Sequence, residues 1–282
     1  MKDIVIIPAF NRPEYLFVTL SLLKECDRAK EMKYLFALDA GFTHKTFEVI
    51  KDLMHGWDYE IMYNNGTKYG AMKQSYNLLT AYTKAAAEAK EYVFLIEDDI
   101  FCGRSFFTSH YQIHAKHPDI FCSIGSKLHN QHFIHKPQTL NVSTCQTDIS
   151  SIYQSWGVCF HKDIINMYIR EHANLQYYTS PSRYMIKNFP NHFLKSTFTE
   201  QDGLLRRIAD ASGLAIGYPD YPRCYHAGIW SYHRQGENVR AWGFEKRLKY
   251  IIDNCFDMNK MMKHNEFGDV FVADLKVDAE IK

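Results

Sequence analysis

Short apolar runs alternate, along the first hundred residues, with longer segments whose apolar positions recur every three or four residues. Strands that are apolar throughout are typical of a parallel sheet whose two faces are both buried. The pattern therefore predicts an α/β fold, a mostly parallel sheet with helices on both faces, in the order β-α-β-α-β-α-β. The expected strands are residues 3–8, 34–39, 59–63 and 92–96, and the expected helices are residues 15–24, 43–54 and 69–89.

Beyond residue 99 the pattern is less regular. We read residues 127–150 and 175–195 as loops, and the tail after residue 242 as amphipathic and then acidic. With no repeat and no linker, one compact domain is the simplest organisation. The remaining expected elements are helices at 105–115, 163–172 and 198–212, and strands at 119–123, 152–160 and 214–218.

Composition agrees with a globular enzyme-sized domain. Of 282 residues 46% are hydrophobic and 15% aromatic, which is enough for a sizeable core and argues against disorder. The seven cysteines form no C-x-x-C pair, which argues against a zinc cage and for buried thiols in a reducing compartment. No signal peptide and no apolar stretch of bilayer length is present, so we expect a cytoplasmic protein with no membrane-spanning segment.

Charge is distributed unevenly. The net charge of +1 excludes a uniformly basic nucleic-acid binder. Residues 104–195, however, hold nine Lys or Arg against four Asp or Glu, a net charge of +5, whereas the flanking segments carry −3 and −1. This middle segment is either a solvated surface or a surface that faces an anionic polymer.

Candidate chemistry follows the predicted strands, because open α/β sheets bind ligands at the carboxyl ends of their strands. Glu97, Asp98 and Asp99 come directly after the fourth strand. Three adjacent acids repel one another unless a cation or hydrogen-bond donors compensate them, and a divalent ion held together with substrate phosphates would do so. The alternative is a solvated turn whose acids cap the next helix.

The loop after the first strand contains Pro8, Phe10, Asn11 and Arg12. It matches neither the G-x-G-x-x-G fingerprint nor the P-loop. Arg12 could contact a phosphate; the alternative is an ordinary strand–helix turn.

Two later segments complete the candidate site. Glu200 and Asp202 stand at the start of a predicted helix, where acids either complement the helix dipole or serve as a general base. His226, followed by Gly228, lies after a proline-rich segment and fits a loop that folds back onto a site.

In this order, PAFNRPEYL, LDAG, EDD, EQDGLLRR and YHAG resemble the motifs of GT-A nucleotide-sugar glycosyltransferases over residues 4–233, most of the chain. The first is similar to the family-2 entry motif. LDAG and EDD are closer to the N-acetylglucosaminyltransferase I family, whose EDD replaces the usual D-x-D. EQDGLLRR departs from the common E-D-x-D-L form, which leaves open whether Asp202 or Glu200 is the base.

The resemblance implies residue roles. Asp39 would contact the nucleoside, Asp98 the ribose, and Asp99 would ligate Mn²⁺ or Mg²⁺ with His226 as a second ligand or diphosphate contact. Asp202 would be the base, with Glu200 the second choice. The donor-binding residues would be Pro8, Phe10, Asn11, Arg12, Asp39, Lys68 and Asp98.

The implied reaction moves a sugar from a nucleotide-diphosphate donor, most simply a UDP-sugar, to an acceptor hydroxyl with inversion. Residues 1–103 would form the donor-binding half, residues 104–242 the acceptor-binding and catalytic half of the same domain, and residues 243–282 a C-terminal tail. Trp156 and residues 180–184 are expected acceptor contacts.

Several acceptors and classes stay open. The acceptor would be a bacterial surface glycan or, as in phage DNA glucosylation, DNA carrying a hydroxymethylated pyrimidine, which must leave the base stack. A nucleotidyltransferase would show a glycine-rich basic loop after the first strand, and a non-catalytic sugar-binding module would not need a separate downstream acid. Neither the oligomeric state nor the donor sugar follows from the sequence.

Overall fold

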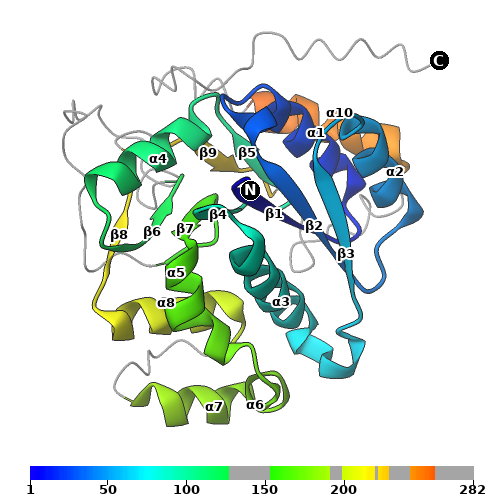
Figure 1. Ribbon diagram of the computed structural model, residues 1–282. Helices are drawn as coiled ribbons and strands as arrows, with labels where there is room; N and C mark the ends of the chain where they lie inside the picture. The colour runs from blue at the N-terminus through cyan, green and yellow to red at the C-terminus, as the bar shows by residue number, and fades with distance from the viewer. Residues whose placement is uncertain (127–152, 191–198, 220–221, 229–241, 258–282) are drawn as a thin grey trace.

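The computed structural model describes residues 1–126, 153–190, 199–219, 222–228 and 242–257 (Figure 1). In this part of the chain the main sheet has seven strands in the order β3-β2-β1-β4-β7-β6-β8. Neighbouring strands from β3 to β4 run parallel, as do β6 and β8, whereas β7 is antiparallel to both β4 and β6. The strands are β1 Ile4–Ala9, β2 Lys33–Asp39, β3 Tyr59–Asn64, β4 Tyr92–Leu95, β6 Ile120–Ile124, β7 Val158–His161 and β8 Ala215–Gly217.

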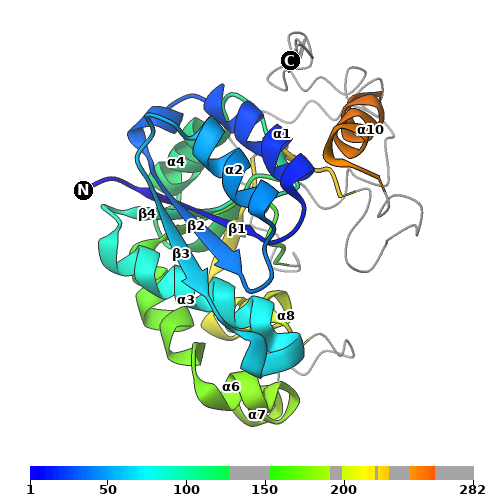
Figure 2. The ribbon, with the colours of Figure 1, turned by 90° about the vertical axis from the view of Figure 1, so that its right-hand side faces the viewer.

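Helices cover both faces of this sheet (Figure 2). On one face lie α1 Pro13–Lys24, α2 His44–Leu53 and α4 Phe106–Lys116. On the other face lie α3 Lys73–Glu88, α6 Leu175–Thr179, α7 Pro181–Asn188 and α8 Gln201–Ser212, together with the π-helical turn η4 Ile165–Ile169. The predicted α/β class, a mostly parallel sheet with helices on both faces, is therefore confirmed.

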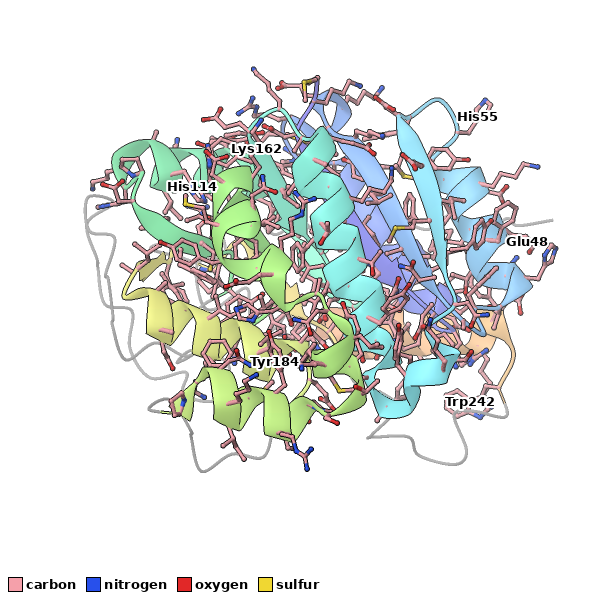
Figure 3. All side chains as sticks on the ribbon, turned by 60° about the horizontal axis from the view of Figure 1, so that its bottom comes forward. Glu48, His55, His114, Lys162, Tyr184 and Trp242 are labelled. Atoms are coloured by element: carbon pink, nitrogen blue, oxygen red, sulfur yellow. The ribbon has the colours of Figure 1, made fainter. Side chains whose placement is uncertain are left out.

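Alternate residues of each central strand enter opposite cores, as a pleated strand requires. Ile4 and Ile6 of β1 pack with α3, whereas Val5 and Ile7 pack with α1 and α2. All four side chains are at most 1% exposed. Side chains fill the layers on both sides of the sheet (Figure 3). The continuous apolar runs in the sequence thus reflect burial on two faces.

A small second sheet lies beside the main one. It pairs β5 Ile100–Cys102 antiparallel with β9 Cys224–His226, so that Ile100 stands opposite His226. The last described helix, α10 Phe244–Asp257, packs on α1 and on this sheet through a separate cluster that includes Tyr15, Phe101 and Leu248.

Two expectations need correction. Residues 175–195 are not one long loop: the described part forms α6 and α7, whose first turns are set by the Asn174 cap and by Pro181. The expected helix over 69–89 begins later than predicted: residues 69–72 belong to the 3₁₀ turn η2 Thr67–Met72, which is kinked at Gly70 (φ 53°), and α3 starts at Lys73. The loop expected at 127–150 lies outside the described residues.

Five of the seven cysteines fall in the described part, and all five are buried free thiols, as expected: Cys26, Cys102, Cys122, Cys159 and Cys224. None of the helices that the structure describes is long and apolar enough to cross a membrane.

Candidate functional site

The three acids of the E-D-D segment lie between β4 and β5, at the carboxyl end of β4. Asp98 and Asp99 are only 5% and 3% exposed, and Glu97 is half-buried. Neighbouring backbone fixes them: the Thr19 hydroxyl donates to the Asp98 carbonyl at 2.7 Å, and the Ala227 amide donates to the Asp99 carbonyl at 2.8 Å. These acids are thus part of the interior rather than of a solvated turn.

Arg12 supplies a positive charge to the acids. Its Nη1 donates to Asp99 Oδ2 at 2.7 Å, and its Nε and Nη2 donate to the two carboxylate oxygens of Asp98. The fork geometry of a guanidinium suits such a bidentate contact. Arg12 was expected as a possible phosphate contact; in this structure its guanidinium contacts Asp98 and Asp99.

The pKa values of the acids diverge. Burial and mutual repulsion raise the pKa of Glu97, and burial raises the pKa of Asp98 to about 6 although Arg12 opposes the shift. Burial also acts on Asp99, but Arg12 and His226 outweigh it and hold the pKa of Asp99 below its usual range. Asp99 is therefore the acid of the triplet that most firmly keeps its negative charge.

Asp202 joins this group from a distant part of the chain. It lies in the first turn of α8, and among the neighbouring charges its carboxylate has the largest effect on the pKa of Glu97. Partial desolvation raises the pKa of Asp202 to about 6, while a hydrogen bond with Ser155 lowers it. Because Asp202 is exposed, solvent screens part of these effects.

Contacts with α3 and α6 fix the first turn of α8. The Ser75 hydroxyl accepts from the Gln201 amide at 3.0 Å and lies 3.0 Å from Gln201 Oε1, to which it donates. Tyr177 donates its hydroxyl to the Thr199 carbonyl at 2.8 Å. Glu200 is the N-cap residue, is exposed, and makes no side-chain cap hydrogen bond. Of the two candidate bases, Asp202 is the one whose carboxylate affects the pKa of Glu97.

His226 reaches the acids from β9. Its Nε2 lies 3.5 Å from Asp99 Oδ2, and its ring stacks on Trp156 with centroids 4.7 Å apart and an interplanar angle of 6°. Trp156, which was expected to contact the acceptor, therefore lies next to His226. A Cβ at Gly228 would lie 3.0 Å from Asp99 Oδ2 and 2.9 Å from the His226 ring, so a glycine allows the loop to pass this close.

Two neighbouring side chains carry atoms of the kinds that ligate divalent cations. Asp99 and His226 offer a carboxylate oxygen and an imidazole nitrogen, and Arg12 already places a positive charge on the same oxygen. Within the described residues no group of three or more His, Cys, Asp or Glu is arranged as a metal site. Two protein ligands match a Mg²⁺-type site in which substrate phosphates and water complete the coordination shell.

A second group of predicted residues surrounds the end of β2. Asp39 is 6% exposed, its Oδ1 accepts from the Ala40 amide at 2.8 Å, and burial raises its pKa. Lys73 Nζ lies 3.9 Å from Asp39 Oδ2 and 4.5 Å from the centre of the Phe10 ring. Phe10 itself is fixed because its carbonyl accepts from the Thr46 hydroxyl at 3.1 Å. Phe10, Asp39 and Lys73 therefore form one cluster.

The remaining predicted residues lie around these two groups. Pro8 is in β1 opposite Ala37 of β2, and Asn11 is exposed in the turn before α1. Lys68 is exposed on η2, and its ammonium lies 5.0 Å from the centre of the Tyr69 ring rather than beside Asp39.

Sequence reasoning missed Lys73, Ser155 and Thr19. Lys73 sits in a helical pattern where a lysine usually marks the solvated face. Ser155 carried a weak signal, because it adjoins the Trp156 that the sequence had indicated.

No protein-family model and no curated protein sequence matches the chain. Solved structures share its arrangement at low similarity. The crystal structure of S. aureus TarS has 14% identity and a TM-score of 0.49, and the match covers 80% of this chain and 36% of that one. This chain thus spans about a third of that TarS chain.

Two further neighbours are transferases. The galactosyltransferase LgtC, in complex with donor and acceptor sugar analogs, has 10% identity and a TM-score of 0.48 over 88% of this chain and 94% of that one. The mannosyltransferase PcManGT from Pyrobaculum calidifontis, in complex with GDP-Man and Mn²⁺, has 12% identity and a TM-score of 0.46 over 88% and 69%. These values are too low to identify an activity.

Proposed function

We propose that the protein is a metal-dependent, inverting glycosyltransferase that moves a sugar from a nucleotide-diphosphate donor to an acceptor hydroxyl. Among such donors we propose a UDP-sugar. One observation carries the proposal. Four carboxylates from two distant segments, Glu97–Asp99 after β4 and Asp202 in α8, interact at one site, with Arg12 and His226 beside them. A binding module would not need this concentration of acids, of which Asp98 and Asp99 are buried at a cost in stability.

The chain's residues divide the work between donor and acceptor. Phe10, Asp39 and Lys73 form the group that would hold the nucleoside end, and Arg12 and Lys68 supply positive charge for phosphates. Asp202, whose pKa is raised to about 6, is suited to accept the proton of the acceptor hydroxyl near neutral pH. A single carboxylate base acting opposite the leaving diphosphate implies inversion at the anomeric carbon.

Asp99 and His226 would hold Mn²⁺ or Mg²⁺, which supplies the charge that stabilises the leaving diphosphate. Asp98, bound by the Arg12 fork, would lie at the ribose. No acid on the leaving side is then required of the protein.

We propose a bacterial surface glycan as the acceptor. The alternative acceptor is DNA with hydroxymethylated pyrimidines, and what favours it is the basic middle segment, whose Arg183 and Lys187 are both exposed on α7. The two acceptors differ in the salt dependence of binding, which is steep for DNA and small for a neutral glycan.

The test is a thermal-shift screen of nucleotide sugars with and without Mn²⁺, followed by measurement of UDP-sugar hydrolysis. A bound donor raises the melting temperature by mass action. We expect stabilisation that requires the cation in the wild type and is lost in Asp99→Asn, whereas Asp202→Asn keeps donor binding and loses turnover. Stabilisation by nucleoside triphosphates but not by nucleotide sugars would favour a nucleotidyltransferase, and binding without any turnover would favour a sugar-binding protein.

A further inference from the structure

Two side chains meet at a single carboxylate oxygen, Asp99 Oδ2, and the backbone of Gly228 passes close to it. Arg12 Nη1 lies 2.7 Å from it, His226 Nε2 lies 3.5 Å from it, and a Cβ on Gly228 would lie 3.0 Å from it. A divalent cation held by Asp99 and His226 would therefore compete with the Arg12 guanidinium for this oxygen. Two positive charges on one carboxylate oxygen repel each other, so Arg12 in its present position opposes the cation.

The acidic group includes two further carboxylates beside Asp98 and Asp99. One guanidinium contacts Asp98 and Asp99, while Glu97 and Asp202 interact electrostatically with these acids. The four carboxylates thus attract a further cation, while Arg12 occupies Asp99 Oδ2, which belongs to the acid that most firmly keeps its negative charge.

An anionic diphosphate offers Arg12 a different partner. Guanidinium groups bind phosphate oxygens in the same bidentate way as they bind a carboxylate. Arg12 lies in the turn between β1 and α1, at the carboxyl end of the strands, where such a ligand would enter.

We propose that Arg12 is an internal counter-ion that suppresses cation binding at Asp99 until a nucleoside diphosphate draws its guanidinium away, so that cation and nucleotide bind cooperatively. Arg12 would be a positioning residue for the cation and a contact residue for the diphosphate. Linkage requires the effect to be mutual: whatever factor the nucleotide adds to cation affinity, the cation adds to nucleotide affinity. The inference rests on the proposed function for the diphosphate and for the cation at Asp99 and His226, but not for sugar transfer.

The first measurement uses Mn²⁺ alone, titrated into the full chain while free Mn²⁺ is followed by electron paramagnetic resonance. We expect Arg12→Gln to bind Mn²⁺ more tightly than the wild type, by roughly 5- to 150-fold, the range typical of coupling between sites. Arg12→Lys, which keeps the charge but lacks the fork, should fall between them and serves if the glutamine variant does not fold. Arg28→Gln is the matched control, because Arg28 pairs with Glu31 at the surface.

Two further measurements test where the cation binds and where Arg12 moves. The tighter Mn²⁺ binding should vanish in Arg12→Gln combined with Asp99→Asn, which would show that the cation binds at Asp99. Without metal, UDP should bind Arg12→Gln more weakly than the wild type, because Arg12 contacts the phosphates in the complex.

Equal or weaker Mn²⁺ binding by Arg12→Gln would overturn the counter-ion role, and unchanged UDP affinity would overturn the transfer of Arg12 to the diphosphate. Neither Mn²⁺ result depends on sugar transfer. A protein that transfers no sugar but shows the tighter Mn²⁺ binding would refute the proposed function and leave the counter-ion role standing.

Discussion

Arg247 and Glu14 form an ion pair in which Arg247 Nε lies 2.8 Å from Glu14 Oε1, and the side chain of Glu14 is fully buried. Glu14 is in the first turn of α1, two residues after Arg12, whereas Arg247 belongs to α10. The pair therefore ties the C-terminal helix to the turn that carries the Arg12 guanidinium. Residues 243–282 were expected to be a tail; in their described part they form a helix that packs on the domain.

Arg247→Met should destabilise the protein by about 3 kcal/mol, because it leaves a buried carboxylate without its partner. Glu14→Gln combined with Arg247→Met should cost less, since no unpaired charge remains. Denaturant unfolding measures both. Arg28→Met, which removes an exposed pair with Glu31, should cost about 1 kcal/mol or less. If Arg247→Met and Arg28→Met lower the free energy of unfolding equally, Glu14 and Arg247 do not depend on each other as a buried pair should.

The cost of Arg247→Met should depend on pH. Burial raises the pKa of Glu14 above its ordinary value of 4.5, against the effect of its own backbone amide and of Arg247. A raised pKa in the folded state means that folding takes up protons, so this group's contribution to stability falls as pH rises from 4.5 to the raised value. Without Arg247 the pKa of Glu14 should be raised further. The difference in unfolding free energy between Arg247→Met and the wild type should therefore become smaller as pH falls toward 4.5.

Gly228→Ala should disturb the site, because its Cβ would lie 2.9 to 3.0 Å from the His226 ring and Asp99 Oδ2. We expect a loss of about 1–3 kcal/mol in stability, as overpacking usually causes, together with weakened cation-dependent activity. Gly243→Ala is the control, since the nearest atom to its Cβ is 3.7 Å away. If the two variants behave alike in unfolding and in activity, the close approach of Gly228 to Asp99 is not important.

More of the fold than of the candidate site could be predicted from the sequence. The parallel half of the sheet was predictable because β1, β2 and β4 are buried on both faces and read as unbroken apolar runs. The three-residue strands β5 and β9 were not predicted, because they are too short to show a period. Their pairing is what brings His226 to Asp99, so the site depends on an element that periodicity could not reveal.

The partners of the site residues were also beyond the sequence. The pattern placed Arg12 and Asp98 after the carboxyl ends of two predicted strands, but it could not decide between a phosphate and a carboxylate as the partner of Arg12. That choice depends on side-chain geometry over 86 residues of separation. The roles of Asp202, Glu200 and Lys68 stay predictions.

Asp202→Asn should lower kcat by about 10²- to 10⁴-fold and leave donor affinity nearly unchanged, because a general base acts on the acceptor. Partial desolvation raises the pKa of Asp202 to about 6, and a base must be deprotonated to work. The wild-type kcat should therefore rise with pH through about 6 and level off above it. Glu200→Gln should keep both the rate and this profile. A dead Glu200→Gln beside an active Asp202→Asn would make Glu200 the base.

Lys73→Met should weaken nucleotide binding, because Lys73 lies between Phe10 and Asp39 in the expected nucleoside group. Lys68→Met is the comparison at a position of the same charge, where the ammonium lies over Tyr69. Calorimetric titration with UDP measures both affinities. A larger loss in Lys68→Met than in Lys73→Met would support Lys68 as the donor contact and move the nucleoside away from Phe10.

The choice between glycan and DNA acceptors can be tested on α7. Arg183 and Lys187 are four residues apart on this helix and are both exposed, whereas Tyr184 and Met185 are buried. If the acceptor is DNA, Arg183→Glu and Lys187→Glu should weaken duplex binding equally for all sequences, and wild-type binding should fall steeply between about 50 and 200 mM salt as phosphate contacts release counterions. Electrophoretic shift measures this, with Lys51→Glu on α2 as the control for net charge. A neutral glycan acceptor predicts almost no salt dependence, and absence of any shift at the lowest salt would rule against duplex DNA, because the phosphate attraction is strongest there.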